Sequence, residues 1–87
     1  MLKISETAVE AIREMTGGAG LRLIGHDVDG DIELELEAAE EPIVDDQVVE
    51  QEGVRVFLDP VAAAALDDQM LDVEPHGDHV HLTFVPQ

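Results

Sequence analysis

The feature that most constrains the fold is residues 53–66, where the sequence changes from the period of a strand to the period of a helix. An apolar residue recurs at every second position, as on one face of a β-strand, at Val54, Val56 and Leu58. Asp59 and Pro60 then supply the residue types favoured at the N-cap and first position of a helix, and an Ala-rich run follows. The segment predicts a strand that leads directly into a short helix.

The composition argues against several classes of chemistry. The 87 residues include no cysteine, which excludes disulfides, thiolate zinc sites, cysteine nucleophiles and cysteine-ligated clusters. Ser5 is the only serine and precedes a predicted helix, so we expect it to cap that helix rather than to act in a triad. With two aromatic residues, Phe57 and Phe84, the core must be largely aliphatic, and a large aromatic ligand pocket is not expected. We expect a protein that is not an enzyme.

The formal net charge is −17, from 21 acidic residues against four Lys and Arg. This charge makes phosphate backbones and anionic membranes unfavourable partners, so neither nucleic acid nor membrane binding is expected. Either a high-salt setting inside the cell or a functional need for acidity accounts for the composition. No apolar run approaches the length of a membrane span, and we expect a cytoplasmic location.

The N-terminal part predicts a strand over residues 1–4 and then a helix capped by Ser5 or Thr7, with Thr7 and Glu10 in capping-box spacing. One helical face is apolar, comprising Ala8, Ala11, Ile12 and Met15. Glycines at 17, 18 and 20 end this helix. A phosphate-binding loop is the alternative interpretation, but such loops precede a helix and carry a lysine. A helix C-cap and linker is favoured.

Residues 21–25 and 31–37 are predicted as strands joined by a turn, because Asp29-Gly30 is a strong hairpin dipeptide. Acidic residues alternate with apolar ones in the second strand, and we expect the apolar set to face the core, namely Ile32, Leu34 and Leu36. The spacing of Asp27, Asp29 and Asp31 also resembles the start of a calcium loop. The glycine and glutamate that such a loop needs further on are missing, so an acidic turn is favoured.

An exposed acidic connection is expected over residues 38–47, followed by a second hairpin that pairs residues 48–50 with 54–56. Residues 1–87 are predicted to form a single domain. We expect an α+β fold, mainly β, with six or seven short strands in mixed sheets that form a sandwich or partly closed barrel. Two short helices pack against these sheets.

The order of these parts resembles the HesB-like family, the A-type iron–sulfur cluster carriers and scaffolds. The resemblance rests on Leu-Arg-Leu at 21–23, the hairpin near Asp29, the acidic connection, Gly-Val-Arg-Val-Phe-Leu-Asp-Pro at 53–60, and the Leu-Asp pairs at 66–67 and 71–72. It covers nearly the whole chain. It implies a HesB-like fold, protein partners in iron–sulfur assembly, and a homodimer.

The resemblance also implies three cysteine ligands that this sequence does not contain. The first would fall near residues 27–29, and the other two lie in a C-terminal Cys-Gly-Cys tail that has no counterpart in residues 85–87. Because clusters select thiolate ligands, we expect a cysteine-less member that cannot hold a cluster through cysteine. Its expected role is an interaction or accessory one near iron–sulfur cluster assembly.

Histidines suggest an alternative function as a divalent metal-binding protein. His79 and His81 are two residues apart on the last predicted strand, so their imidazoles share a face and can converge on one ion. The resemblance implies that this histidine turn lies close to the acidic turn. The two together give a predicted nitrogen and oxygen site for iron or zinc, made of His26, Asp27, Asp29, His76, His79 and His81. The competing interpretation is a set of solvated surface histidines.

Overall fold

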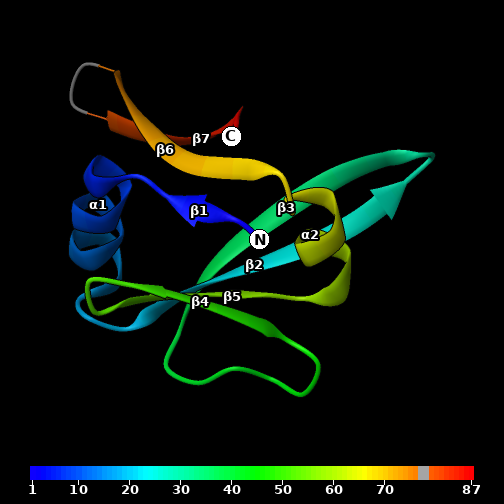
Figure 1. The fold of residues 1–87 in the computed structure, drawn as a ribbon, viewed down its shortest axis with the longest axis horizontal. Helices are drawn as coiled ribbons and strands as arrows, with labels where there is room; N and C mark the ends of the chain where they lie inside the picture. Colours follow the sequence, from blue (N-terminus) through cyan, green and yellow to red (C-terminus); the bar gives the residue numbers. More distant parts are fainter. Residues whose placement is uncertain (77–78) are drawn as a thin grey trace.

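The computed structural model describes residues 1–76 and 79–87, and the side chains of all of these except residues 75, 76, 79 and 80. The described part contains two helices and seven strands (Figure 1). In chain order these are β1 (Lys3–Ile4), α1 (Glu6–Thr16), β2 (Gly20–Val28), β3 (Asp31–Ala39), β4 (Gln47–Gln51), β5 (Val54–Leu58), α2 (Pro60–Ala65), β6 (Gln69–His76) and β7 (His79–Pro86).

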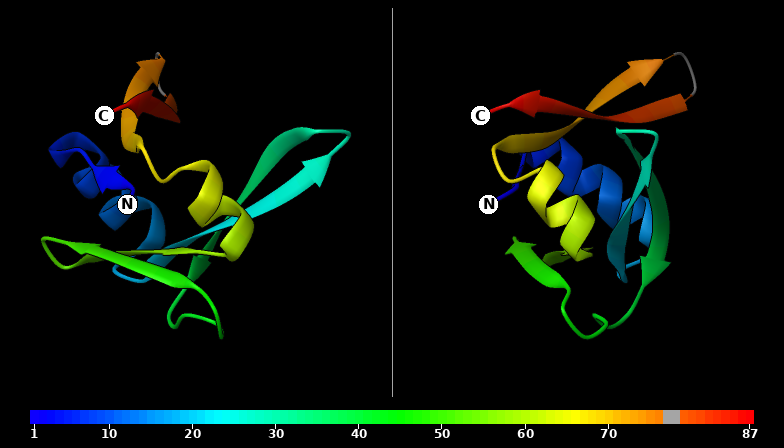
Figure 2. Two further views of the ribbon diagram at one scale, coloured as in Figure 1. Left: turned by 45° about the vertical axis from the view of Figure 1, so that its right-hand side comes forward. Right: turned by 90° about the vertical axis from the view of Figure 1, so that its right-hand side faces the viewer.

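The strands form two mixed sheets. One has the order β3-β2-β5-β4, with β2 and β5 parallel and the other pairs antiparallel. The other has the order β1-β6-β7, with β1 parallel to β6. Both helices lie in the space between the sheets, and the described strands do not close into a barrel (Figure 2). The mainly β fold with two mixed sheets and two helices is therefore confirmed.

Residues 53–66 form β5 and α2 as predicted. Asp59 is the N-cap of α2, and its Oδ1 accepts hydrogen bonds from the backbone N–H of Ala62 at 2.8 Å and of Gly25 at 3.0 Å. The same carboxylate therefore starts the helix and attaches it to β2. Strand β5 lies between β2 and β4 in the sheet, and its residues are buried except Arg55, which is half-buried. Phe57 packs so closely on Gly20 that a Cβ at residue 20 would lie 2.6 Å from its ring.

Helix α1 begins one residue after Ser5, whose Oγ accepts from the Ala8 backbone N–H at 3.1 Å. The Thr7 capping box is therefore not used, because Thr7 already lies inside the helix. The Ser5 hydroxyl also donates to Asp72 Oδ1 at 2.7 Å, which joins the start of α1 to β6. Of the expected apolar face, Ala8 and Ile12 are buried and Ala11 is half-buried, whereas Met15, in the last turn, is 54% exposed.

The hydrophobic core lies between the sheets and α1. Its buried members are Leu2, Ile4, Ala8, Val9, Ile12, Leu21, Leu23, Val49, Val54, Val56, Leu58, Ala62, Leu66 and Leu71. Strand β3 contributes less than predicted, since Ile32 is 43% and Leu36 45% exposed while Leu34 is half-buried. The alternation places these residues on one face correctly. The expectation that this face is buried is wrong, because β3 is an edge strand and α2 packs over β2 instead.

Candidate functional site

The first half of the predicted site is the turn between β2 and β3. Asp29 and Gly30 have φ values of 52° and 88°, the left-handed pair that a two-residue hairpin of type I′ requires. The Asp27 carboxylate accepts a hydrogen bond from the Gly30 N–H at 3.2 Å and so stabilises the turn. These contacts are those of a hairpin turn, which the sequence analysis favoured over a calcium loop.

His26 lies on the opposite face of the hairpin from Asp27, because successive side chains of a strand alternate. Its Nε2 is 3.1 Å from Glu35 Oε2, and both side chains are more than half exposed. Glu33 is its register partner on β3. The structure therefore separates His26 from Asp27 and places it among glutamates that the sequence prediction did not include.

The second half of the predicted site is on the other sheet. His76 and His79 are register partners where β6 ends and β7 begins, and their side chains lie outside the described part. His81 is exposed, and its register partner on β6 is Glu74. In Figure 1 this end of β6 and β7 is on the opposite side of the molecule from the turn between β2 and β3.

Among the side chains that the structure describes, no three of His, Asp or Glu are grouped closely enough to hold a metal ion. The six-residue iron or zinc site therefore stays a prediction. Its test is a titration of iron or zinc into the protein before and after His79 and His81 are replaced by Ala. Unchanged affinity would remove the hypothesis.

A charged cluster that the sequence did not reveal lies where the acidic connection returns to the sheet. Arg22 on β2 binds Asp46 through two hydrogen bonds, Nε to Oδ2 at 3.1 Å and a terminal nitrogen to Oδ1 at 3.2 Å. The Asp46 side chain is 1% exposed, which corrects the prediction that the whole connection is exposed. The Arg22 guanidinium, and next the Ile43 N–H, hold the pKa of Asp46 below its ordinary value, against the opposing effect of burial.

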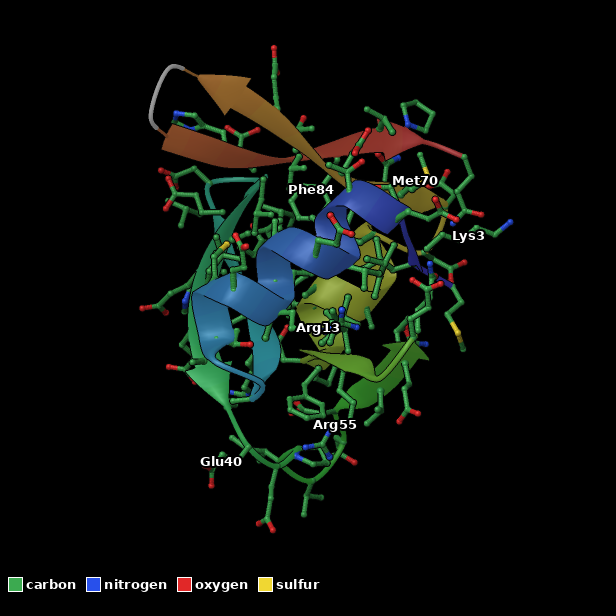
Figure 3. All side chains as sticks on the ribbon, turned by 90° about the vertical axis from the view of Figure 1, so that its left-hand side faces the viewer. Lys3, Arg13, Glu40, Arg55, Met70 and Phe84 are labelled. Carbon is green, nitrogen blue, oxygen red and sulfur yellow. The ribbon has the colours of Figure 1, made fainter. Side chains whose placement is uncertain are left out.

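The other two arginines also hold loops. Arg13 on α1 donates to the Glu52 carbonyl at 2.7 Å, and Arg55 donates to the Glu40 carbonyl at 2.8 Å (Figure 3). Arg55 also lies over the ring of Phe57, 5.3 Å from its centroid. The guanidinium groups thus contact backbone carbonyls, Asp46 and Glu37, and most of the 21 acidic side chains have no arginine partner among the described residues.

The two mixed sheets, with one helix after β1 and another after β5, form a fold that is also seen in two solved structures. One similar solved structure is Escherichia coli SufA, involved in biosynthesis of iron–sulfur clusters, with a TM-score of 0.82 and 24% identity over 98% of this chain and 79% of SufA. Another is IscA with the [2Fe–2S] cluster, with a TM-score of 0.80 and 20% identity over 99% of this chain and 85% of IscA. No protein-family model and no curated protein matches the sequence. The likeness confirms the predicted fold.

The donors of this chain do not fit a cluster held by cysteine. Iron–sulfur clusters select thiolate ligands, and the 87 residues contain no thiol. Where the resemblance places the first cysteine, Asp27 is engaged with the turn and Asp29 is exposed in a left-handed conformation. No chemical step through a cysteine-bound cluster can be assigned to these residues.

Proposed function

We propose that this protein is a non-enzymatic accessory protein of iron–sulfur cluster assembly, which has the framework of a cluster carrier but does not hold a cluster through cysteine. The observation that carries the proposal is the combination of a HesB-like fold over nearly the whole chain with a sequence that has no cysteine. A chain of this kind has the backbone framework of a carrier without its cysteine ligands. Binding to other proteins is then the property that the framework still offers.

The contacts of Ser5 support a role without catalysis. Its hydroxyl donates to Asp72 and accepts from Ala8, so the only serine is engaged in capping α1. The pair of Arg22 and Asp46 likewise holds the connection before β4. These polar contacts thus have structural roles. The homodimer that the resemblance implies remains a prediction.

The test has two parts, and both use the purified protein. In the first, the protein immobilised at physiological salt captures partners from an extract of its own cells, beside an unrelated acidic domain of similar net charge. We expect iron–sulfur assembly proteins to be retained by this protein and not by the control, because basic proteins that bind any acidic surface are retained by both.

In the second part, a purified cysteine-bearing carrier of the same fold passes a [2Fe–2S] cluster to an apo-ferredoxin, with and without this protein. We expect the transfer rate to change when this protein is present. Capture of no assembly protein beyond the control, together with an unchanged transfer rate, would contradict the proposed function.

Among the described residues, neither helix has the length and apolar character needed to cross a membrane.

A further inference from the structure

The outer edge of β3, the edge that faces away from β2, is built to accept another strand. Within residues 1–76 and 79–87, β3 pairs with β2 alone and ends the four-stranded sheet. It is nine residues long, contains no proline, and keeps an unbroken register with β2 from Ala39 to Asp31. Natural edge strands are usually protected by shortness, proline, bulges or charged side chains. Of these β3 has only acidic side chains, which repel an acidic strand but not a basic one. The hairpin it forms with β2 projects from the rest of the molecule (Figure 2).

One face of β3 is apolar and exposed. Ile32 and Leu36 keep nearly half of their surface in contact with solvent. Beside Ile32, the same face continues into an open apolar groove of about 530 Å³ against α2, lined by Ile32, Pro60, Val61, Ala64 and Ala65. Exposed apolar surface that runs across two elements is typical of an interaction site.

The other face of β3 carries a row of exposed carboxylates at every second position, namely Asp31, Glu33, Glu35 and Glu37. Two basic residues of β2 lie opposite this row. Arg22 is 3.6 Å from Glu37 but donates its hydrogen bonds to Asp46, and His26 Nε2 is 3.1 Å from Glu35. The row therefore keeps most of its negative charge. A second copy of β3 added at this edge would bring two such rows together, and like charges on neighbouring strands are destabilising.

We propose that the outer edge of β3 binds an extended segment of a partner protein in which Lys or Arg alternates with apolar residues. The segment adds to the sheet as a further strand, so its backbone pairs with the unpaired edge. Its cations lie beside the glutamates, and its apolar side chains cover Ile32 and Leu36. This proposal depends on the edge strand alone and holds whether or not the protein serves iron–sulfur assembly.

The test measures fluorescence anisotropy of a labelled nine-residue peptide in which Lys alternates with Val, at physiological salt. The control peptide has the same composition in an order without a period of two, and a second control carries N-methyl groups at alternate residues. We expect the alternating peptide to bind roughly tenfold more tightly than either control, the combined effect expected of several cross-strand pairs and backbone hydrogen bonds. Equal binding of all three peptides would reduce the effect to general attraction by the acidic surface and overturn the proposal.

Matched variants of the protein separate the edge from its net charge. Replacing Glu33, Glu35 and Glu37 by Gln should weaken binding of the alternating peptide roughly tenfold. Replacing three exposed acids of α1 by Gln (Glu6, Glu10 and Glu14) changes the net charge equally and should leave most of the affinity. Equal losses in the two variants would overturn the proposal. So would self-association in sedimentation velocity that is abolished when Ile32 and Leu36 are replaced by Ser, because the occupant would then be a second copy.

Because Ile32 and Leu36 are exposed, their replacement by Ser tests the apolar face without removing core contacts. We expect this variant to melt close to the parent and to bind the alternating peptide more weakly. Hydrogen exchange gives a readout specific to strand addition, since the outward amides of β3 should become protected when the peptide binds. Binding without such protection would exclude the added strand.

Discussion

Replacing Asp59 by Ala should destabilise the protein more than the loss of an ordinary surface aspartate. The Asp59 side chain caps α2 through Ala62 and also accepts the N–H of Gly25 on β2. The backbone of Asp59 makes its own hydrogen bonds, from its N–H to Leu23 and from Ala63 to its carbonyl, and these remain in the variant. The change therefore isolates the carboxylate.

The expected cost follows from the two hydrogen bonds. Loss of an N-cap costs about 1 kcal/mol, and a buried N–H left without a partner costs about 1–3 kcal/mol. The sum of about 2–4 kcal/mol is a large part of the roughly 4–13 kcal/mol expected for a domain of this size. At about 4–8 °C per kcal/mol, the melting temperature should fall by roughly 8–30 °C.

The assay is thermal unfolding followed by far-ultraviolet circular dichroism, since the chain has neither Trp nor Tyr for fluorescence. Asp59→Asn keeps an oxygen that can accept both bonds and should melt close to the parent. Asp68→Ala is a matched control at an exposed position. A melting temperature of Asp59→Ala within a few degrees of the parent would refute the reasoning that one carboxylate joins α2 to β2.

Three further predictions follow from charge and packing. Because the net charge is −17, the melting temperature should rise between low and high ionic strength, and a flat response would contradict self-repulsion as a destabilising effect. Because Arg22 lowers the folded-state pKa of Asp46, this aspartate stabilises the fold above its unfolded pKa near 4 and loses that effect as the pH falls through the folded pKa. In urea unfolding, Asp46→Asn should thus have a lower free energy of unfolding than the parent, by a difference that shrinks below about pH 4. A difference that does not vary with pH would exclude this linkage. Gly25→Ala should cost about 1–3 kcal/mol, because the new Cβ would lie 2.8 Å from the backbone nitrogen of Ala62, whereas Ala38→Val on the exposed part of β3 should cost little.

Local chemistry made much of the fold predictable. The Asp-Pro pair that starts α2 and the Asp-Gly pair that turns β2 into β3 depend on neighbouring residues, and both form as expected. Alternation also identified which residues of β3 share a face. These features require no knowledge of the distant chain.

Predictions about burial were weaker because burial depends on what the rest of the chain covers. Ile32 and Leu36 are exposed because β3 is at the edge of its sheet, and the order of strands is not a local property. Asp46 is buried by Arg22, 24 residues earlier in the sequence. Ser5 reaches Asp72 across 67 residues. Sequence spacing alone gives no signal for such contacts.

The geometry of the predicted site could be derived only in part from the sequence, because it also depends on contacts between segments that are distant in the chain. His26 and Asp27 are adjacent in the chain but lie on opposite faces of β2. The glutamates of β3 that surround His26 were identified only as an outward face. Cross-strand register, which brings Glu33 opposite His26, becomes visible once the hairpin is paired residue by residue.

Iron and sulfide analysis, with an absorption spectrum, shows directly whether this protein holds a cluster. The protein is purified and treated with iron and sulfide in the absence of oxygen. Because the chain has no Cys, Trp or Tyr, a bound iron–sulfur chromophore would be recorded over a nearly empty near-ultraviolet background. The account predicts sulfide far below one equivalent per chain and no cluster absorption. Near-stoichiometric iron and sulfide with visible absorption bands would contradict the proposal that this protein has the framework of a carrier but does not hold a cluster.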